Sequence, residues 1–396
     1  MDYSLYFHIP FCVHRCAYCD FNTYARQEDS VPAYVDALCK EIEFVGRRFS
    51  TDDKVHTIFF GGGTPSLLSA NQFEIIFNLI RKSFELTENA EITIEANPGT
   101  VNLDQLKQLH AIGINRISFG VQSANSEELR MLERAHDFFD VIHSVSWARK
   151  AGFENLNLDL IYGLPEQTLQ TWQTTVKRIL DLNPGHISAY ALTLEHGTPF
   201  GRWSSRGLLP LPDPDLAAEM YEWASAEFES AGYTQYEISN WAKPNRECVH
   251  NLQYWRGLPY LGFGAGVHGY ANGYRYSNVL RIKTYIDRMK DTHSADFDFP
   301  LSPSTVNQHK QSLHDDMSEY MMTGLRLTRE GIAASAFRQR FGRELKDVYQ
   351  NEIDELIHLG LLEWNQKTSK EFESSEVLRL TRRGRLLGNQ VFMRFI

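Results

Sequence analysis

The sequence predicts an α/β protein built on a parallel sheet, and three observations support this fold class. Six short stretches in the first two hundred residues have the length and composition of strands: Leu5–Ile9, His56–Phe60, Glu91–Ala96, Arg116–Val121, Asn155–Ile161 and His186–Leu192. Amphipathic stretches of helical length separate them. Some of these end at a glycine just before the next strand, such as Gly113 and Gly152, where glycine accepts the left-handed conformation that closes a helix. Alternating strands and helices imply parallel strands with right-handed crossovers.

The strand–helix rhythm leaves two architectures open. Six units are fewer than the eight of a complete barrel, so the strands form either an open barrel or a doubly wound sheet. The helical faces are clear from steps of three and four residues between apolar side chains. The predicted helices include Tyr34–Phe49, Phe73–Phe84 and Trp172–Leu180.

Three regions follow one another along the chain, divided as 1–209, 210–301 and 302–396. The rhythm ends at Pro210–Pro214, where three prolines in five residues predict a stiff linker. A long helix over Leu216–Ala231 and a glycine- and aromatic-rich segment follow. The last region has three predicted helices and two short strands, which is typical of a winged-helix-like module: His314–Leu325, Ala333–Phe341, Leu345–Leu359, Leu361–Trp364 and Val377–Leu380. We expect a packing role for it, because the chain is acidic.

Composition and charge exclude several classes of protein. Apolar residues make up 42% and charged residues 23% of the 396 residues, as in an ordinary globular protein. The net charge of −10 argues against general nucleic-acid binding. No apolar run is long enough to span a bilayer, and a strand beginning near Tyr3 leaves no room for a removable leader, so we expect a cytoplasmic protein. Basic stretches at 338–343 and 379–385 are expected to be solvated surface, with peripheral membrane contact as the alternative.

Cysteine usage indicates a metal centre. Three of the five cysteines, Cys12, Cys16 and Cys19, form a C-x3-C-x2-C pattern directly after the first strand. An odd count with such crowding does not suit a disulfide framework. Cys39 lies on a predicted helix and is expected to be a small buried hydrophobe.

Soft thiolate ligands suit iron–sulfur clusters, zinc or Cu(I). Three thiolates leave one iron of a four-iron cubane without a protein ligand, and a small molecule can coordinate there. The alternative is zinc held by the three cysteines and His8 or His14. The chain has no second cysteine knuckle, so the cluster is favoured.

The cysteine pattern after an N-terminal strand resembles the signature of the radical S-adenosylmethionine (radical SAM) superfamily. The run Tyr6–Tyr24 is more similar to the coproporphyrinogen dehydrogenase branch of that superfamily. The resemblance implies a partial (β/α)6 barrel over 1–209, which agrees with the six units. It also implies a 4Fe–4S cluster on the three cysteines, whose open iron chelates S-adenosylmethionine.

Further positions for the cofactor lie at predicted strand ends. The run Phe60–Ser66 contains three consecutive glycines, which let a backbone approach a ligand closely. It resembles the superfamily's segment that meets the cofactor's amino group. An acid between Leu158 and Leu160 is costly unless it is paired or binds a ligand. The resemblance implies the following contacts to S-adenosylmethionine: Tyr6, Gly62, Gly63, Thr64, Glu95, Gln122, Arg134 and Asp159.

Two features favour one group within the branch. The dehydrogenases carry a further cysteine two places after the third, where this chain has Phe21. The run His250–Trp255 resembles the HNxxYW motif of HemW-type haem chaperones, and this resemblance extends over nearly the whole chain, including Tyr236–Asn240.

The motif implies that His250 contacts haem. Imidazole is a common axial ligand of haem iron, and the neighbouring aromatic rings could stack on a porphyrin. Cys248 is another soft ligand nearby. The alternative is structural, with His250 and Asn251 bonding a loop while Tyr254 and Trp255 pack in the core.

Three functional hypotheses follow, and none assigns a catalytic residue. The first is a haem chaperone that passes haem to acceptors such as respiratory enzymes. The second is an oxygen-independent coproporphyrinogen III dehydrogenase, which uses a 5′-deoxyadenosyl radical for oxidative decarboxylation. The third, and weakest, is a zinc-stabilised nucleic-acid binder.

Overall fold

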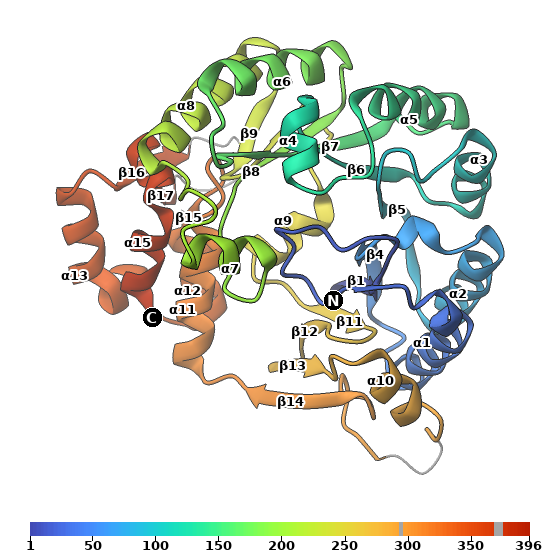
Figure 1. Cartoon of the computed structure of the whole chain (residues 1–396). Coiled ribbons are helices and arrows are strands. Elements are labelled where there is room, and N and C mark those ends of the chain that lie inside the picture. Colours follow the sequence, from blue (N-terminus) through green and yellow to red (C-terminus); the bar gives the residue numbers. More distant parts are fainter. Residues whose placement is uncertain (293–295, 368–374) are drawn as a thin grey trace. The chain divides into compact units, whose positions relative to one another are not determined.

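The computed structural model describes residues 1–292, 296–367 and 375–396 (Figure 1). Contacts divide the chain into two compact units. Unit 1 comprises Met1–Ala231 and Pro259–His309, and unit 2 comprises Gly232–Leu258 and Lys310–Ile396. The sequence-based division at 209 and 301 stays a prediction, since contacts distribute its middle region between the two units. No helix among the described residues is both long and apolar enough to cross a membrane.

Unit 1 is organised around six parallel strands, hydrogen-bonded in chain order. They are β1 (Asp2–Ile9), β4 (Lys54–Gly62), β5 (Leu86–Ala96), β6 (Arg116–Gln122), β7 (Asn155–Tyr162) and β8 (His186–Ala191). All six predicted strands are confirmed. The strand order never reverses, so right-handed crossovers place the connecting helices on one face of the sheet, as Figure 1 shows. This arrangement is that of an open (β/α)6 barrel and not of a doubly wound sheet, whose order reverses.

Capping residues explain where several helices of unit 1 begin and end. The capping box of Ser69 and Gln72 starts α2, and Thr168 and Thr171 do the same for α6. Gly113, at φ 116°, ends α3 as predicted. The helices are α1 (Val31–Gly46), α2 (Ala70–Ser83), α3 (Leu103–Ile112), α4 (Ser126–Met131), α5 (Phe138–Ala151), α6 (Leu169–Asp181), α7 (Pro199–Ser205), α8 (Pro214–Ser230) and α10 (Ile282–Arg288), with 3-10 turns at Glu28–Ser30 and Pro65–Leu67.

Buried apolar side chains on the outer face alternate with mostly polar side chains on the inner face along the six strands. On the outer face, Phe60 of β4 packs against Phe73 and Phe77 of α2, with ring centroids 5.2 and 5.4 Å apart. Phe7 of β1 stacks on Phe60 at 4.9 Å. Truncating such a buried ring typically costs about 3–5 kcal/mol. The inner face therefore remains available for polar residues.

Four further strands extend the sheet beyond β1, and the sequence did not predict them. β11 (Tyr260–Phe263) pairs parallel to β1. β12 (His268–Ala271) and β13 (Tyr274–Asn278) then continue antiparallel, followed by β14 (Thr305–Lys310). A buried carboxylate, Glu41 of α1, accepts hydrogen bonds from the Gly264 amide and the Tyr285 hydroxyl at 2.8 and 2.7 Å. This fixes α1 to the extension.

Unit 2 contains the predicted three helices and two strands of the C-terminal region. The strand order of its small sheet is β15-β17-β16, so a third short strand is added to the hairpin. Residues 368–374, between the two longer strands of this sheet, lie outside the described residues. Its elements are β9 (Thr234–Glu237), β10 (Asn240–Ala242), α9 (Val249–Trp255), α11 (Leu313–Gly324), β15 (Ile332–Ala333), α12 (Ala334–Phe341), α13 (Leu345–His358), β16 (Leu362–Lys367), β17 (Ser375–Leu380), α14 (Arg382–Leu386), α15 (Gly388–Phe392) and a 3-10 turn at Met393–Phe395.

The two basic stretches lie in unit 2 and carry surface ion pairs. Arg338 pairs with Glu344 at 3.2 Å, and Arg379 pairs with Glu363 at 2.9 Å. Paired, solvated side chains of this kind contribute little to stability or to phosphate binding. They are consistent with the solvated surface expected from the sequence.

Candidate functional site

The cysteine-bearing loop is clamped at both ends. The short strands β2 (Phe11–Cys12) and β3 (Tyr24–Ala25) pair with each other at its base. The buried His8 donates through Nε2 to the Asn22 carbonyl at 2.9 Å, and the Asn22 amide donates to the Ala265 carbonyl at 3.1 Å. The loop between these anchors is therefore held in place at the end of β1.

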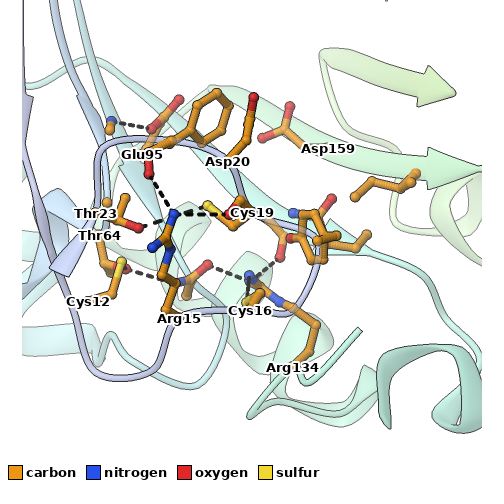
Figure 2. Close-up of a pocket in the computed structure, with 18 of the residues that line it drawn as sticks. Cys12, Arg15, Cys16, Cys19, Asp20, Thr23, Thr64, Glu95, Arg134 and Asp159 are labelled. Carbon is orange, nitrogen blue, oxygen red and sulfur yellow. Dashed lines mark hydrogen bonds between the residues drawn. The ribbon is translucent and has the colours of Figure 1, made fainter. Parts of the chain in front are cut away.

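Most of the residues predicted from the sequence line one pocket of about 390 Å³ at the carboxyl ends of the parallel strands. This size suits a small-molecule ligand, and barrels of this kind place their sites at this end. Figure 2 shows the three cysteines, Thr64, Glu95, Arg134 and Asp159 converging on the pocket. The structure brings together Cys12, Cys16, Cys19, Gly62, Gly63, Thr64, Glu95, Gln122, Arg134 and Asp159.

The three thiols are partly exposed and unbridged. Burial raises the pKa of Cys12 and of Cys19, and hydrogen bonds oppose that rise: Thr64 is the largest opposing contact for Cys12, and the Phe21 backbone for Cys19. Arg15 braces the loop by donating to the carbonyls of Cys19 and Phe21 at 3.4 and 3.5 Å. Three thiolates with donors beside them fit the ligand set of an iron–sulfur cluster.

The two histidines considered as zinc ligands have other partners. His8 uses Nε2 for the Asn22 carbonyl, and its Nδ1 lies 3.3 Å from the Tyr6 hydroxyl. His14 pairs through Nε2 with Glu133 at 3.2 Å. Within residues 1–292, 296–367 and 375–396, no three His, Cys, Asp or Glu side chains are arranged to hold a single metal ion.

The glycine run approaches the cysteine loop so closely that side chains are excluded. A Cβ on Gly63 would lie 2.5 Å from the Phe11 carbonyl oxygen, and a Cβ on Gly62, at φ 110°, would lie 2.5 Å from the His8 ring. The Thr64 amide donates to the Phe11 carbonyl at 2.8 Å. The backbone directly after β4 is thus bound to the base of the cysteine loop.

Two carboxylates form an acidic wall of the pocket. Glu95 accepts from the Gly62 amide at 3.0 Å, and its pKa is raised to about 7 by burial and then by Asp159. Asp159 accepts from the Ser118 hydroxyl at 2.7 Å and from the Asn157 amide at 2.8 Å. Opposed acids in a partly buried pocket favour a cationic ligand, because a positive charge relieves their repulsion.

The remaining predicted residues flank these acids. Burial raises the pKa of the Tyr6 hydroxyl, and Glu95 adds to the rise, so Tyr6 lies next to the acidic wall although it does not line the pocket. Gln122 ends β6 in a left-handed conformation at φ 68°. Arg134 donates to the Gly120 carbonyl at 2.7 Å.

Sequence reasoning missed several polar residues at the site, among them Asn97 and Thr23. Asn97 lines the pocket and contacts both Thr64 and Arg134. Its position two residues after Glu95, at the end of β5, was a usable signal. Thr23 also lines the pocket and is 5% exposed, but nothing in the sequence distinguishes it from an ordinary loop threonine.

His250 belongs to unit 2 and is buried among its neighbours. It lies on α9, is 1% exposed, and its Nε2 is 2.8 Å from the Tyr254 hydroxyl. Cys248 is fully buried just before the helix. Nearby, Arg326 lies over the Trp255 ring at 4.3 Å and pairs with the buried Glu237 at 3.4 Å. The expected haem contact of His250 stays a prediction.

Comparisons with known proteins cover the whole chain. The model of the radical SAM superfamily matches residues 6–179, and that of the HemN C-terminal domain matches residues 311–387. The heme chaperone HemW of Bacillus subtilis (strain 168) is 39% identical over 395 residues, which cover 99% of each chain. The chain belongs to the HemW family of the radical SAM superfamily.

Other relatives agree with membership of the HemW family. The heme chaperone HemW of Escherichia coli (strain K12) is 35% identical over 99% of this chain and 98% of its own. The solved structure of coproporphyrinogen III oxidase (HemN) from Escherichia coli, described as a radical SAM enzyme, superposes with a TM-score of 0.81. It is 26% identical, covering 99% of this chain and 89% of its own. The predicted fold class is confirmed, and the family implies a 4Fe–4S cluster and S-adenosylmethionine.

Proposed function

We propose that this protein is a haem chaperone that binds a 4Fe–4S cluster, S-adenosylmethionine and haem, and delivers haem to acceptor proteins such as respiratory enzymes. The observation that supports it most is the full-length likeness to proteins named heme chaperone HemW. The three cysteines at a strand-end pocket supply the ligand chemistry that the proposal needs. The proposed compartment is the cytoplasm, and membrane-bound acceptors would be met at the membrane surface.

Cys12, Cys16 and Cys19 would hold the cluster, which supplies an iron with an open coordination position when it is bound. Around that position the chain's own residues orient S-adenosylmethionine. Glu95 and Asp159 offer negative charge to its ammonium and sulfonium groups. Gly62 and Gly63 present bare backbone, with Tyr6, Thr64, Gln122 and Arg134 completing the proposed contacts.

His250 is the proposed haem contact. Because its ring is 1% exposed, haem binding through it would require α9 to open. His250→Ala is expected to weaken haem binding in a titration followed by the haem absorbance band, whereas the exposed His143→Ala on α5 is the matched control. Equal haem affinity in both variants would remove His250 from the proposal.

The second candidate function is coproporphyrinogen III dehydrogenase, which the likeness to HemN favours. Against it, Phe21 occupies the position at which the dehydrogenases carry a further cysteine, and this residue is 63% exposed. Reconstituted protein supplied anaerobically with coproporphyrinogen III, S-adenosylmethionine and a reductant is expected to form no protoporphyrinogen IX. Product formation at enzymatic rates would establish the dehydrogenase instead.

A further inference from the structure

A side-chain donor lies beside each of the three cysteine sulfurs, and the three donors come from different parts of the chain. The Thr64 hydroxyl donates to Cys12 Sγ at 3.7 Å, and Arg134 Nη1 donates to Cys16 Sγ at 3.5 Å. The Thr23 hydroxyl lies 3.9 Å from Cys19 Sγ, the longest of the three contacts. Because a thiolate has no proton to donate, Thr64, Arg134 and Thr23 must be the donors once the cysteines are ionised. Figure 2 shows them around the sulfurs.

Asn97 connects two of these donors. Its amide nitrogen donates to Thr64 Oγ1 at 2.9 Å, and its amide oxygen accepts from Arg134 Nη2. Because arginine only donates, the amide oxygen must face Arg134 and the nitrogen must face Thr64. Thr64 Oγ1 then has its acceptor side occupied, so its single proton points to Cys12. Arg134 is held further by the Gly120 carbonyl at 2.7 Å.

The position of Asn97 is itself fixed. It follows directly after β5, and its carbonyl accepts from the Thr100 hydroxyl at 2.7 Å and from the Thr100 amide at 3.1 Å. The side chain thus projects from an anchored turn into the pocket that it lines. Nothing in this arrangement requires a ligand to set the direction of the donors.

We propose that Asn97 is a positioning residue that aims Thr64 and Arg134 at Cys12 and Cys16, and that these donors, with Thr23, raise the reduction potential of the cluster held there. This rests on the proposed function, because it presupposes the cluster. Donors aimed at thiolate sulfur stabilise added negative charge. Reduction adds one electron to the cluster, so the donors favour the reduced form, and hydrogen bonds to sulfur are a recognised determinant of cluster potential.

The test is a redox titration of the anaerobically reconstituted full chain, followed by electron paramagnetic resonance without S-adenosylmethionine. Thr64→Val, Thr23→Val and Asn97→Ala are each expected to shift the midpoint potential to more negative values. Thr64→Ser, which keeps the hydroxyl, is expected to restore the wild-type potential. Asn102→Ala is the matched control, since Asn102 caps α3 and bonds only the Gln105 amide in its cap.

A double variant separates positioning from a general structural effect. Because Asn97 acts partly through the Thr64 hydroxyl, the shift in Asn97→Ala with Thr64→Val is expected to be smaller than the sum of the single shifts. Additive shifts, or potentials equal to the wild type in Thr64→Val and Asn97→Ala with full iron content, would overturn the inference. If Asn97→Ala fails to take up iron, the pair Thr64→Val and Thr64→Ser still tests whether a hydroxyl donor to Cys12 raises the reduction potential of the cluster. A wild-type chain that takes up no iron would overturn the proposed function as well.

Discussion

The pocket of unit 1 and the HNxxYW segment of unit 2 were both singled out by motifs, but their polar groups are used differently. In the pocket, partly exposed thiols and two carboxylates face a cavity of about 390 Å³. In unit 2, His250 is bonded to Tyr254, and Glu237, which is fully buried, is paired with Arg326 over Trp255.

This difference shows how side chains that are available to a ligand can be told from side chains that stabilise the fold. Polar groups that face a cavity at strand ends, such as Glu95 with its pKa raised by burial and then by Asp159, are typical of binding sites. Polar groups that bond one another inside a packed unit fix its conformation. The resemblance implied a ligand at both segments. In the described structure the pocket side chains face a cavity, whereas His250 is buried and bonded to Tyr254, so its haem contact stays a proposal.

The largest effect is expected at the cysteines. Replacing Cys12, Cys16 or Cys19 with Ala should reduce the iron content of reconstituted protein from about four per chain to near zero, because each thiolate anchors the cluster. Iron and sulfide analysis measures this. Cys39→Ala, a partly buried thiol on α1, is the control. Full iron content in all three variants would contradict a cluster at this loop.

Disrupting the polar network of unit 2 should lower the free energy of unfolding and leave the iron content unchanged. Arg326→Met leaves Glu237 buried without its cation, so we expect a loss of about 4 kcal/mol in the free energy of unfolding, measured by urea denaturation with tryptophan fluorescence. Arg338→Met, which breaks only the exposed pair with Glu344, should cost less than about 1 kcal/mol. Equal losses in the two variants would remove the distinction between the regions.

The acidic wall predicts a pH dependence of the protein without ligands. The pKa of Glu95 is raised from 4.5 to about 7, first by burial and then by Asp159, while the Gly62 amide and Arg116 oppose the rise. Between these values the folded chain keeps a proton that the unfolded chain releases, so stability falls as pH rises from about 4.5 to 7. Glu95→Gln should remove this fall in the free energy of unfolding, which is on the order of 3 kcal/mol. Parallel stability–pH curves for variant and wild type would contradict the raised pKa.

The smallest effect is expected at a helix cap outside the site. Ser69→Ala removes the capping box of α2 and should cost about 1 kcal/mol, measured by thermal denaturation. Iron content should be unchanged, because the cap does not contact the cysteine loop. A loss of iron would show that the site depends on the general stability of unit 1.

The sequence predicted the six barrel strands from their length and composition and from the amphipathic stretches between them, two of which close at Gly113 and Gly152. It did not predict β11 to β13, because the glycine- and aromatic-rich segment from 259 to 278 has no clear period, and it did not predict β14, which lies outside that segment at Thr305–Lys310. The pocket residues were predicted through strand ends and the family resemblance. The bond of Thr23 to Cys19 and the link through Asn97 depend on loop geometry, which no spacing in the sequence reveals.

The central claim is that the three cysteines and the acidic wall form one site for a cluster and S-adenosylmethionine. The most direct test records electron paramagnetic resonance spectra of the reduced, anaerobically reconstituted protein before and after adding S-adenosylmethionine. The account predicts a 4Fe–4S signal whose g values change when the ligand is added. A signal that saturating S-adenosylmethionine leaves unchanged, or no cluster signal at all, would contradict it.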